Sequence, residues 1–250
     1  GNKNFKFLFS DKDKYVKSTK KIFSIFKCQN CNLIQVDPKI SESEFDIYYP
    51  HQYDPYQSKP VKKTFIQKSY ELLDSFFKLD KVKFELTKLK ELDKKYLDYG
   101  SGSGRHLNHV RELYPKWKLY GYDKSKYAKE NLKKNNFESI ENIENLPDDF
   151  FDIINLSSVI EHLEFPEQTI QLLNKKLVKD GLIIIKTPNW SSLARIIFKK
   201  SWVHYDIPRH MYVFSFKNLR KLLTDKNFDV IHKIYSVNLG VELKSFYRLL

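Results

Sequence analysis

The stretch Leu97-Asp98-Tyr99-Gly100-Ser101-Gly102-Ser103-Gly104 decides the fold expected for this chain. It joins a short apolar strand pattern, Tyr96 to Tyr99, to a helical pattern that places Leu107 and Val110 on one face. Glycine has no Cβ and accepts dihedral angles that other residues avoid, so backbone at such a turn can approach a ligand closely. We therefore expect a ligand-binding loop between the first strand and the first helix of an α/β core.

The rest of the chain supports this fold class. From Lys95 onward, short apolar runs alternate with helical patterns, the rhythm of βαβ units in a mostly parallel sheet. The pattern predicts an α/β fold with a Rossmann-like core, in which helices flank a mostly parallel central sheet, plus a small N-terminal appendage. Further strands are expected at 118–122, near 139–140, at 151–156, at 182–185 and near 230–231.

The first sixty residues differ from the core. Alternating apolar residues between Ile22 and Val36 predict two short strands, and residues 48–60 are aromatic and punctuated by proline. Apolar residues at helical spacing over 61–92 predict one or two helices. We expect an N-terminal appendage with a linker over 1–60 and a ligand-binding domain over 61–250, with its core at 95–235.

The two cysteines of the chain, Cys28 and Cys31, have the spacing of half a zinc or redox site. A structural zinc ion takes four ligands, and the chain has no second pair of thiols. Two reduced cysteines in a turn account for the pattern equally well. We therefore expect no metal, with Cys28 and Cys31 kept as a possible half site for zinc.

The net charge of +13 raises the question of a polyanionic partner. Only six of the 44 basic residues are arginine, and the lysines are spread along almost every segment. Because sequence-reading nucleic-acid interfaces favour arginine, nucleic acid is an unlikely partner, while peripheral contact with an anionic surface stays open. No apolar run reaches the length of a membrane span and no secretory leader is visible, so a cytoplasmic location is expected.

Two acidic residues at strand ends indicate which ligand the glycine loop binds. A dinucleotide motif places its third glycine where this chain has Arg105, and the carboxylate of Asp98 would repel phosphates. That carboxylate suits an ammonium group instead. Asp123 ends the second strand, where a carboxylate binds ribose hydroxyls. Together, Asp98 and Asp123 favour a nucleoside joined to an amino acid, which is S-adenosylmethionine.

The chain resembles the class I S-adenosylmethionine-dependent methyltransferases, in particular the sugar- and small-molecule-associated group called methyltransferase type 23. The resemblance runs from about Lys95 to Tyr235. It is carried by the glycine loop and by Gly121-Tyr122-Asp123, Glu144-Asn145-Leu146-Pro147, Phe151-Asp152-Ile153-Ile154 and Val159-Ile160-Glu161-His162. The cofactor-binding residues that it implies are Asp98, Gly100, Ser101, Gly102, Asp123, Lys124, Asn142, Ile143, Leu156 and Ser157. Some members of this group begin with a zinc ribbon of two Cys-x-x-Cys knuckles, of which this chain has one.

The segment Trp202 to His210 also resembles that group and is expected to roof the acceptor pocket. Trp202, Tyr205 and Arg209 are the expected substrate-binding residues. Ordinary packing of the aromatic rings, and simple pairing of Arg209 with Asp206, are the structural alternatives.

The candidate catalytic bases are His162, His204 and His210. His162 is the first choice because it follows the fourth strand by one helical turn. Its alternative role is a bond to a nearby carbonyl.

The function expected from these observations is methyl transfer from S-adenosylmethionine to a small molecule or glycan, at oxygen, in polysaccharide biosynthesis. Alignment of donor and acceptor supplies most of the catalysis of such an in-line displacement. Two alternatives stay open. One is an NAD(P)-dependent oxidoreductase, disfavoured by Arg105 and Asp98, and the other is a non-catalytic basic binding module on the same fold. The oligomeric state is left open.

Overall fold

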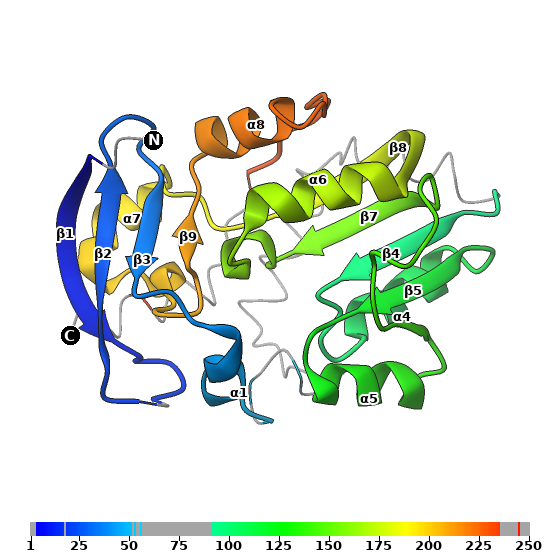
Figure 1. Cartoon of the computed structure of the whole chain (residues 1–250), viewed down its shortest axis with the longest axis horizontal. Coiled ribbons are helices and arrows are strands. Elements are labelled where there is room, and N and C mark those ends of the chain that lie inside the picture. The colour runs from blue at the N-terminus through cyan, green and yellow to red at the C-terminus, as the bar shows by residue number, and fades with distance from the viewer. Residues whose placement is uncertain are drawn as a thin grey trace, which may run out of the picture.

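The computed structural model describes residues 4–17, 19–51, 53, 56, 92–235 and 245. Within these residues the chain forms two sheets (Figure 1). A four-stranded sheet has the order β1-β2-β3-β9, and a five-stranded sheet has the order β6-β5-β4-β7-β8. The helices predicted over 61–92 fall almost entirely on residues outside the described part of the chain.

The five-stranded sheet is parallel throughout and confirms the expected fold class. Its strands are β4 (Lys95–Tyr99), β5 (Lys118–Tyr122), β6 (Glu138–Ile140), β7 (Phe151–Ser157) and β8 (Leu177–Lys186). Leu97 of the central strand β4 pairs with Tyr120 on one side and Ile154 on the other. Because all strands run the same way, the residues that follow β4, β5 and β7 meet at one edge of the sheet.

The helices between these strands follow the predicted apolar spacing. They are α4 (Arg105–Leu113), α5 (Lys126–Lys134) and α6 (Pro166–Lys176), and α8 (Phe216–Thr224) comes later in the chain, after the last strand of this sheet. Leu107 and Val110 of α4 and Ala128 and Leu132 of α5 are buried, as the periodicity predicts. Figure 1 shows α6 and α5 packed beside the strands of this sheet.

The strand expected near Val230 and Ile231 is absent from the structure: residues 226–235 form neither helix nor strand. Ile231 is exposed, with no neighbouring strand in the described residues to bury it. The strand prediction near 230–231 rested on two adjacent apolar residues alone, and it is wrong.

The N-terminal sheet contains β1 (Phe5–Lys12), β2 (Ile22–Cys28) and β3 (Ile34–Asp37), of which β1 was not expected. Its fourth strand, β9 (Tyr212–Val213), comes from the far end of the sequence and pairs antiparallel with β3. A 3-10 helix η1 (Glu42–Glu44) and the short helix α1 (Phe45–Tyr48) follow β3. Short elements also lead into β9: α7 (Leu193–Phe198), η4 (Lys199–Ser201) and η5 (Val203–Tyr205).

A buried ion-pair cluster joins the segment after β1 to the segment before β9. The side chain of Arg209 is fully buried and donates to both oxygens of Asp13, with Nη1–Oδ2 at 3.0 Å and Nη2–Oδ1 at 2.9 Å. Its Nε and Nη2 also donate to Asp206, at 3.1 and 2.7 Å. Two-pronged pairing of this kind fixes the relative position of the paired segments as well as contributing energy.

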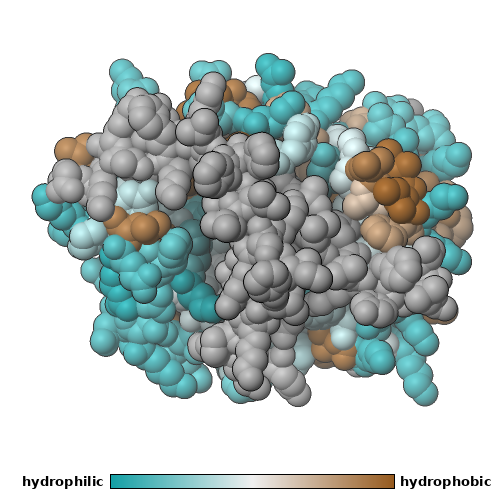
Figure 2. Space-filling view, turned by 180° about the vertical axis from the view of Figure 1, so that it is seen from behind, coloured by the Kyte–Doolittle hydropathy of each residue, from teal (hydrophilic) through white to brown (hydrophobic). Residues whose placement is uncertain are grey.

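Leu193, Ile196 and Ile197 of α7 are more than half exposed. Figure 2 shows hydrophobic surface gathered at the right of its view, the side on which α7 lies in Figure 1 once the molecule is turned. None of the helices in the described residues combines the length and apolar composition needed to cross a bilayer.

The ion-pair cluster generates a stability prediction. Asp13→Asn should lower the free energy of unfolding by about 3 kcal/mol, because it removes one partner from a fully buried charge pair. Asp225→Asn, in the exposed pair Lys221–Asp225, is the matched control and should cost less than about 1 kcal/mol. Chemical denaturation monitored by tryptophan fluorescence measures both values. Equal losses in the two variants would contradict a structural role for the cluster.

Candidate functional site

The glycine loop lies where the carboxyl ends of β4 and β5 meet. Gly100, Gly102 and Gly104 all have positive φ angles, 81°, 52° and 75°, which side-chain-bearing residues rarely adopt. The amide groups of Gly100 and Ser101 donate to the carbonyl of Tyr122, at 2.7 and 3.1 Å. The loop is therefore tied to the end of β5, next to Asp123.

Asp98 is buried on β4, directly before the loop. Its Oδ1 accepts a 2.8 Å hydrogen bond from Nδ2 of Asn155 on the neighbouring strand β7. Burial raises the pKa of this carboxyl, and the hydrogen bond opposes that effect only in part. A cationic group placed here would offset the cost of burying the carboxylate.

Asp123 follows β5 and is also buried. Its Oδ2 accepts from the amide of Gly102 at 3.0 Å, and its Oδ1 accepts from the amide of Ser125 at 2.9 Å. Burial raises the pKa of this carboxyl too. Each oxygen keeps a second lone pair, so the side chain can still accept from two hydroxyl groups.

The loop has one unpartnered polar atom and one very close packing contact. The Oγ atom of Ser101 is buried without a hydrogen-bond partner in the described part of the chain, whereas most buried hydroxyls have one. A Cβ added at Gly100 would lie 2.5 Å from Cγ2 of Val159, so the backbone there is as close to its neighbour as glycine allows. With the buried carboxylates of Asp98 and Asp123, the Ser101 hydroxyl forms a donor and acceptor set that fits the polar groups of S-adenosylmethionine.

The remaining expected cofactor residues differ in exposure. Lys124 and Asn142 are exposed, and Ile143 and Leu156 are buried in the main core cluster. Ser157 at the end of β7 donates from Oγ to Oδ1 of Asn155, at 2.9 Å, and Asn155 in turn holds Asp98. A polar relay thus links the end of β7 to the end of β4.

The contact between Gly100 and Val159 brings a second group of side chains beside the loop. Val159 leads directly into the 3-10 helix η3 (Ile160–His162). Glu161, His162 and His210 each have one potential ligand atom within 4.8 Å of those of the other two. We call these three residues the acceptor cluster. Two of them, His162 and His210, are expected site residues, and the fold brings them together from positions 48 apart.

His162 forms the carbonyl bond named as its alternative role. Its Nδ1 lies 3.0 Å from the carbonyl oxygen of Arg209 and 2.9 Å from the hydroxyl of Tyr49. A carbonyl can only accept, so Nδ1 carries the proton and Nε2 keeps a lone pair. Burial, with the neighbouring His210, lowers the pKa of His162 to about 3. His162 is therefore neutral and a weak base at neutral pH.

His210 has the same tautomer. Its Nδ1 donates to the carbonyl of His204 at 2.8 Å, and its Nε2 lies 4.0 Å from Oε1 of Glu161 and 3.9 Å from Oδ2 of Asp206. Burial lowers the pKa of His210 as well.

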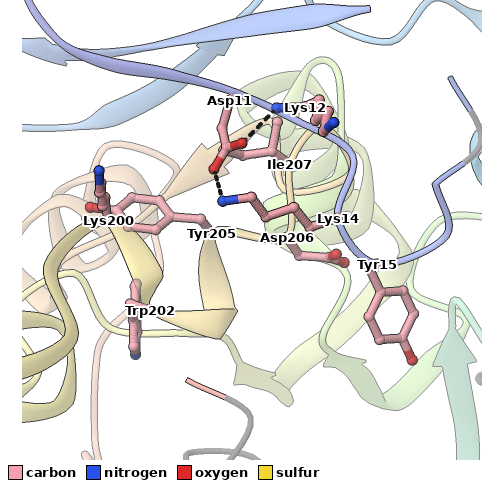
Figure 3. Close-up of a pocket in the computed structure, with 9 residues that line it drawn as sticks. All are labelled: Asp11, Lys12, Lys14, Tyr15, Lys200, Trp202, Tyr205, Asp206 and Ile207. Atoms are coloured by element: carbon pink, nitrogen blue, oxygen red, sulfur yellow. Dashed lines mark hydrogen bonds and ion pairs between the residues drawn. The ribbon is translucent and has the colours of Figure 1, made fainter. Parts of the chain in front are cut away.

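The expected substrate-binding residues lie elsewhere. Trp202 and Tyr205 are buried and pack against each other, with Phe9 against Tyr205. Both occur in the small pocket of Figure 3, which is lined by Asp11, Lys12, Lys14, Tyr15, Lys200, Trp202, Tyr205, Asp206 and Ile207 and by no expected cofactor residue. Side chains of β1 and of the segment after it cover residues 202–207. Trp202 and Tyr205 therefore have the packing role that was named as their structural alternative.

Arg209 and His204 also need correction. Asp13 and Asp206 each occupy one pair of N–H groups of the Arg209 guanidinium, which leaves no pair for a phosphate or carboxylate of the acceptor. The ring of His204 packs at 5.2 Å from that of Trp202, and its carbonyl accepts from His210. Its place in the structure is beside the tryptophan, outside the acceptor cluster.

The sequence interpretation missed a row of tyrosines from the N-terminal part. Tyr49, Tyr53 and Tyr56 contact one another in edge-to-face pairs. Tyr49 reaches His162, whereas the carbonyl of Tyr56 accepts from Asn131 on α5. The negative charge of Asp123 adds to burial in raising the pKa of Tyr56. The aromatic residues at 48–56 could have indicated these tyrosines as site residues. The local sequence does not show, however, that this segment packs at the edge of the sheet where the glycine loop lies.

Glu161 was also missed as a site residue. It is fully buried, neither carboxylate oxygen has a hydrogen-bond partner in the described residues, and burial raises its pKa to about 7. Its position directly before His162 was the signal that could have identified it.

Cys28 and Cys31 are free thiols, Cys28 at the end of β2 and Cys31 in the turn that leads to β3. Among the described residues no third histidine, cysteine or carboxylate joins them in a cluster. The carbonyl of Cys31 accepts a bond from Asn218 on α8.

Comparison with known proteins identifies a family. The family described as "Methyltransferase domain" matches residues 70–233. A SAM-dependent methyltransferase structure from Archaeoglobus fulgidus is 21% identical with a TM-score of 0.49, over 72% of this chain and 89% of that one. A possible histamine N-methyltransferase from Thermotoga maritima is 20% identical with a TM-score of 0.46, over 66% and 80%. No curated protein matches the chain.

The contact at Gly100 leads to a second prediction. Gly100→Ala should destabilise the protein by about 2–4 kcal/mol, because left-handed backbone strain adds to a collision with Val159. Gly104→Ala is the matched control, since its φ is similar but its Cβ would sit at an ordinary 3.7 Å from Phe137. Both variants introduce left-handed backbone strain, so the difference between their unfolding free energies measures the effect of the steric clash with Val159. Adding Val159→Ala to Gly100→Ala should remove most of that difference, and no recovery would argue against the close approach.

Proposed function

Because the chain belongs to the methyltransferase domain family and is an S-adenosylmethionine-dependent methyltransferase, we propose that it methylates a hydroxyl oxygen of a small molecule or glycan. The observation that carries this proposal is the pair of buried carboxylates, Asp98 and Asp123, on either side of the glycine loop. A role in polysaccharide biosynthesis is part of the proposal and rests on the resemblance to sugar-associated members.

Each part of the cofactor has a proposed partner in the loop. Asp98 pairs with the ammonium group and Asp123 accepts from the ribose hydroxyls, while the unpartnered Oγ of Ser101 binds the amino-acid end. Lys124, Asn142 and Ile143 follow β5 and β6 and lie beside the nucleoside, and Leu156 and Ser157 lie on the methyl side. Bound S-adenosylmethionine supplies an electrophilic methyl group on a sulfonium. The rigid strand ends orient it, and alignment accounts for up to about 7–11 kcal/mol of barrier lowering in such reactions.

The acceptor cluster lies next to the loop through the contact of Val159 with Gly100. We propose that the acceptor oxygen approaches there and forms the new C–O bond, while the C–S electron pair stays on sulfur and the hydroxyl proton is released to water. His162 and His210 stay in the site as hydrogen-bond acceptors. Since burial lowers the pKa of both, we assign the role of general base to neither of them.

The tyrosines support the choice of acceptor class. Tyr49 and Tyr53 come from the N-terminal part, and Tyr53 is only half-buried. Aromatic faces combined with hydroxyl groups suit a sugar or aromatic ring, which has apolar faces and polar edges. We propose that residues 1–60 act as the acceptor-side part, together with β9 and the loop before it, and that 61–250 carry the methyl-donor site.

The cofactor subsite can be tested by one conservative substitution. Asp98→Asn should weaken binding of S-adenosylhomocysteine about 10- to 100-fold, because a hydrogen bond to a charged group contributes about 1.5–3 kcal/mol. The amide keeps the acceptor for Asn155, so folding should be retained. Asp93→Asn, at an exposed position five residues earlier, is the control and should bind as the unmodified chain does. Isothermal titration calorimetry measures both. Unchanged affinity in Asp98→Asn would remove the basis of the ammonium subsite.

The acceptor class needs an activity assay. With S-adenosylmethionine and a panel of monosaccharides, sugar nucleotides and phenols, product formation should be limited to hydroxyl-bearing compounds. Mass spectrometry should locate the added 14 mass units (roughly one CH₂) on oxygen. The Asp98→Asn variant serves as the low-activity control. Methylation confined to amines in a matched amine panel would exclude O-methylation.

A further inference from the structure

The strongest unexplained group in the molecule is the side chain of Glu161. It has no exposed surface, and both carboxylate oxygens lack hydrogen-bond partners in the described residues. Buried carboxylates are ordinarily paired, hydrogen-bonded or bound to a metal ion. In the described residues the partners at hand are weak: Nε2 of His210 lies 4.0 Å from Oε1, and the hydroxyl of Thr187 lies nearby. The carboxylate therefore has capacity left for a bound ligand.

The two neighbouring histidines are prepared to bind the same ligand. Each donates Nδ1–H to a backbone carbonyl, His162 to that of Arg209 and His210 to that of His204. This arrangement fixes the tautomer and leaves Nε2 with a free lone pair, as in metal-ligating histidines whose other nitrogen is held by a carbonyl.

The charge of this region also favours a cation. The positive Arg209 is flanked by two carboxylates, Asp13 and Asp206, so the ion-pair cluster has an excess of one negative charge. The carboxyl of Glu161 can add a second when it loses its proton on binding a cation. Among the described residues that touch the cluster, no further lysine or arginine offsets these charges. A divalent cation would balance both.

We propose that Glu161, His162 and His210 bind a divalent transition-metal ion of the zinc class. Two imidazoles and one carboxylate are the ligands of a three-residue catalytic zinc site, which keeps a fourth position open. Magnesium and calcium prefer all-oxygen ligand sets, so they fit these residues poorly.

The geometry requires a modest closure. The three ligand atoms lie within 4.8 Å of one another, whereas ligands at about 2.0–2.2 Å from a tetrahedral metal are separated by about 3.3–3.6 Å. Metal binding would therefore draw the three side chains together by about 1 Å.

The consequence for catalysis rests on the proposed function. An acceptor hydroxyl at the open position would be acidified by the metal, as water is in zinc enzymes, and would lose its proton to solvent. The metal-held oxygen would then attack the methyl carbon. In this arrangement the metal ion would activate the acceptor without a histidine base, and it would favour acceptors with accessible hydroxyl groups.

The test begins with zinc binding alone. The chain carries Cys28→Ser and Cys31→Ser to remove thiol sites, is stripped with a chelator, and is titrated with zinc chloride by calorimetry. One zinc per chain should bind, and magnesium should not compete. Glu161→Gln and His210→Gln should each weaken binding at least about 100-fold, by loss of one of three ligands. His109→Gln, an exposed histidine on α4, is the matched control and should have no effect.

Each variant is also titrated with S-adenosylhomocysteine, which reports folding and the cofactor site independently. Retained cofactor binding with unchanged zinc affinity in Glu161→Gln and His210→Gln would overturn the metal site. Zinc binding without any cofactor binding would instead overturn the proposed function and leave the metal site standing.

Crystals of the chain with zinc provide a measurement that needs no substitution at the cluster. Anomalous scattering should place the ion within about 2.0–2.2 Å of Glu161, His162 and His210. An ion found only at other residues would contradict the assignment.

Discussion

The guanidinium of Arg209, fully buried between Asp13 and Asp206, is the interaction on which the arrangement of the molecule depends. Asp13 follows β1, whereas Arg209 and Asp206 precede β9, so the cluster ties the beginning of the chain to a segment about 190 residues later (206 and 209 against 13). Burying three charges is costly, and only two-pronged geometry makes the arrangement stable. The pairing therefore specifies a position as much as it contributes energy.

That position sets the acceptor side of the site. The backbone carbonyl of Arg209 accepts from His162, and the next residue, His210, faces Glu161. His162 is also positioned by the parallel sheet. It lies in η3, which follows β7, and Val159, directly before η3, packs on the glycine loop. The acceptor cluster is thus assembled by two sheets, one carrying the glycine loop and one supplying the segment that contains His210.

Three carboxyl groups of the site are buried, and burial disfavours their ionised form. Burial raises the pKa values of Asp98, Asp123 and Glu161, and the hydrogen bonds present do not fully oppose this. Such groups destabilise the ligand-free protein and gain favourable partners when cations or hydroxyls arrive. Perturbed carboxyls gathered at the edge of a sheet are typical of functional sites for this reason.

The sequence by itself determined the parallel core and the class of cofactor. Apolar spacing located β4 to β7, and glycines between Asp98 and Asp123 indicated the ligand, because these features depend on local periodicity and on residues near strand ends. Only the tertiary structure decided the roles of Arg209, Trp202 and Glu161. Whether an arginine binds a substrate or a buried aspartate 196 positions away, and whether a carboxyl has a partner, depends on contacts between distant segments that no local pattern encodes.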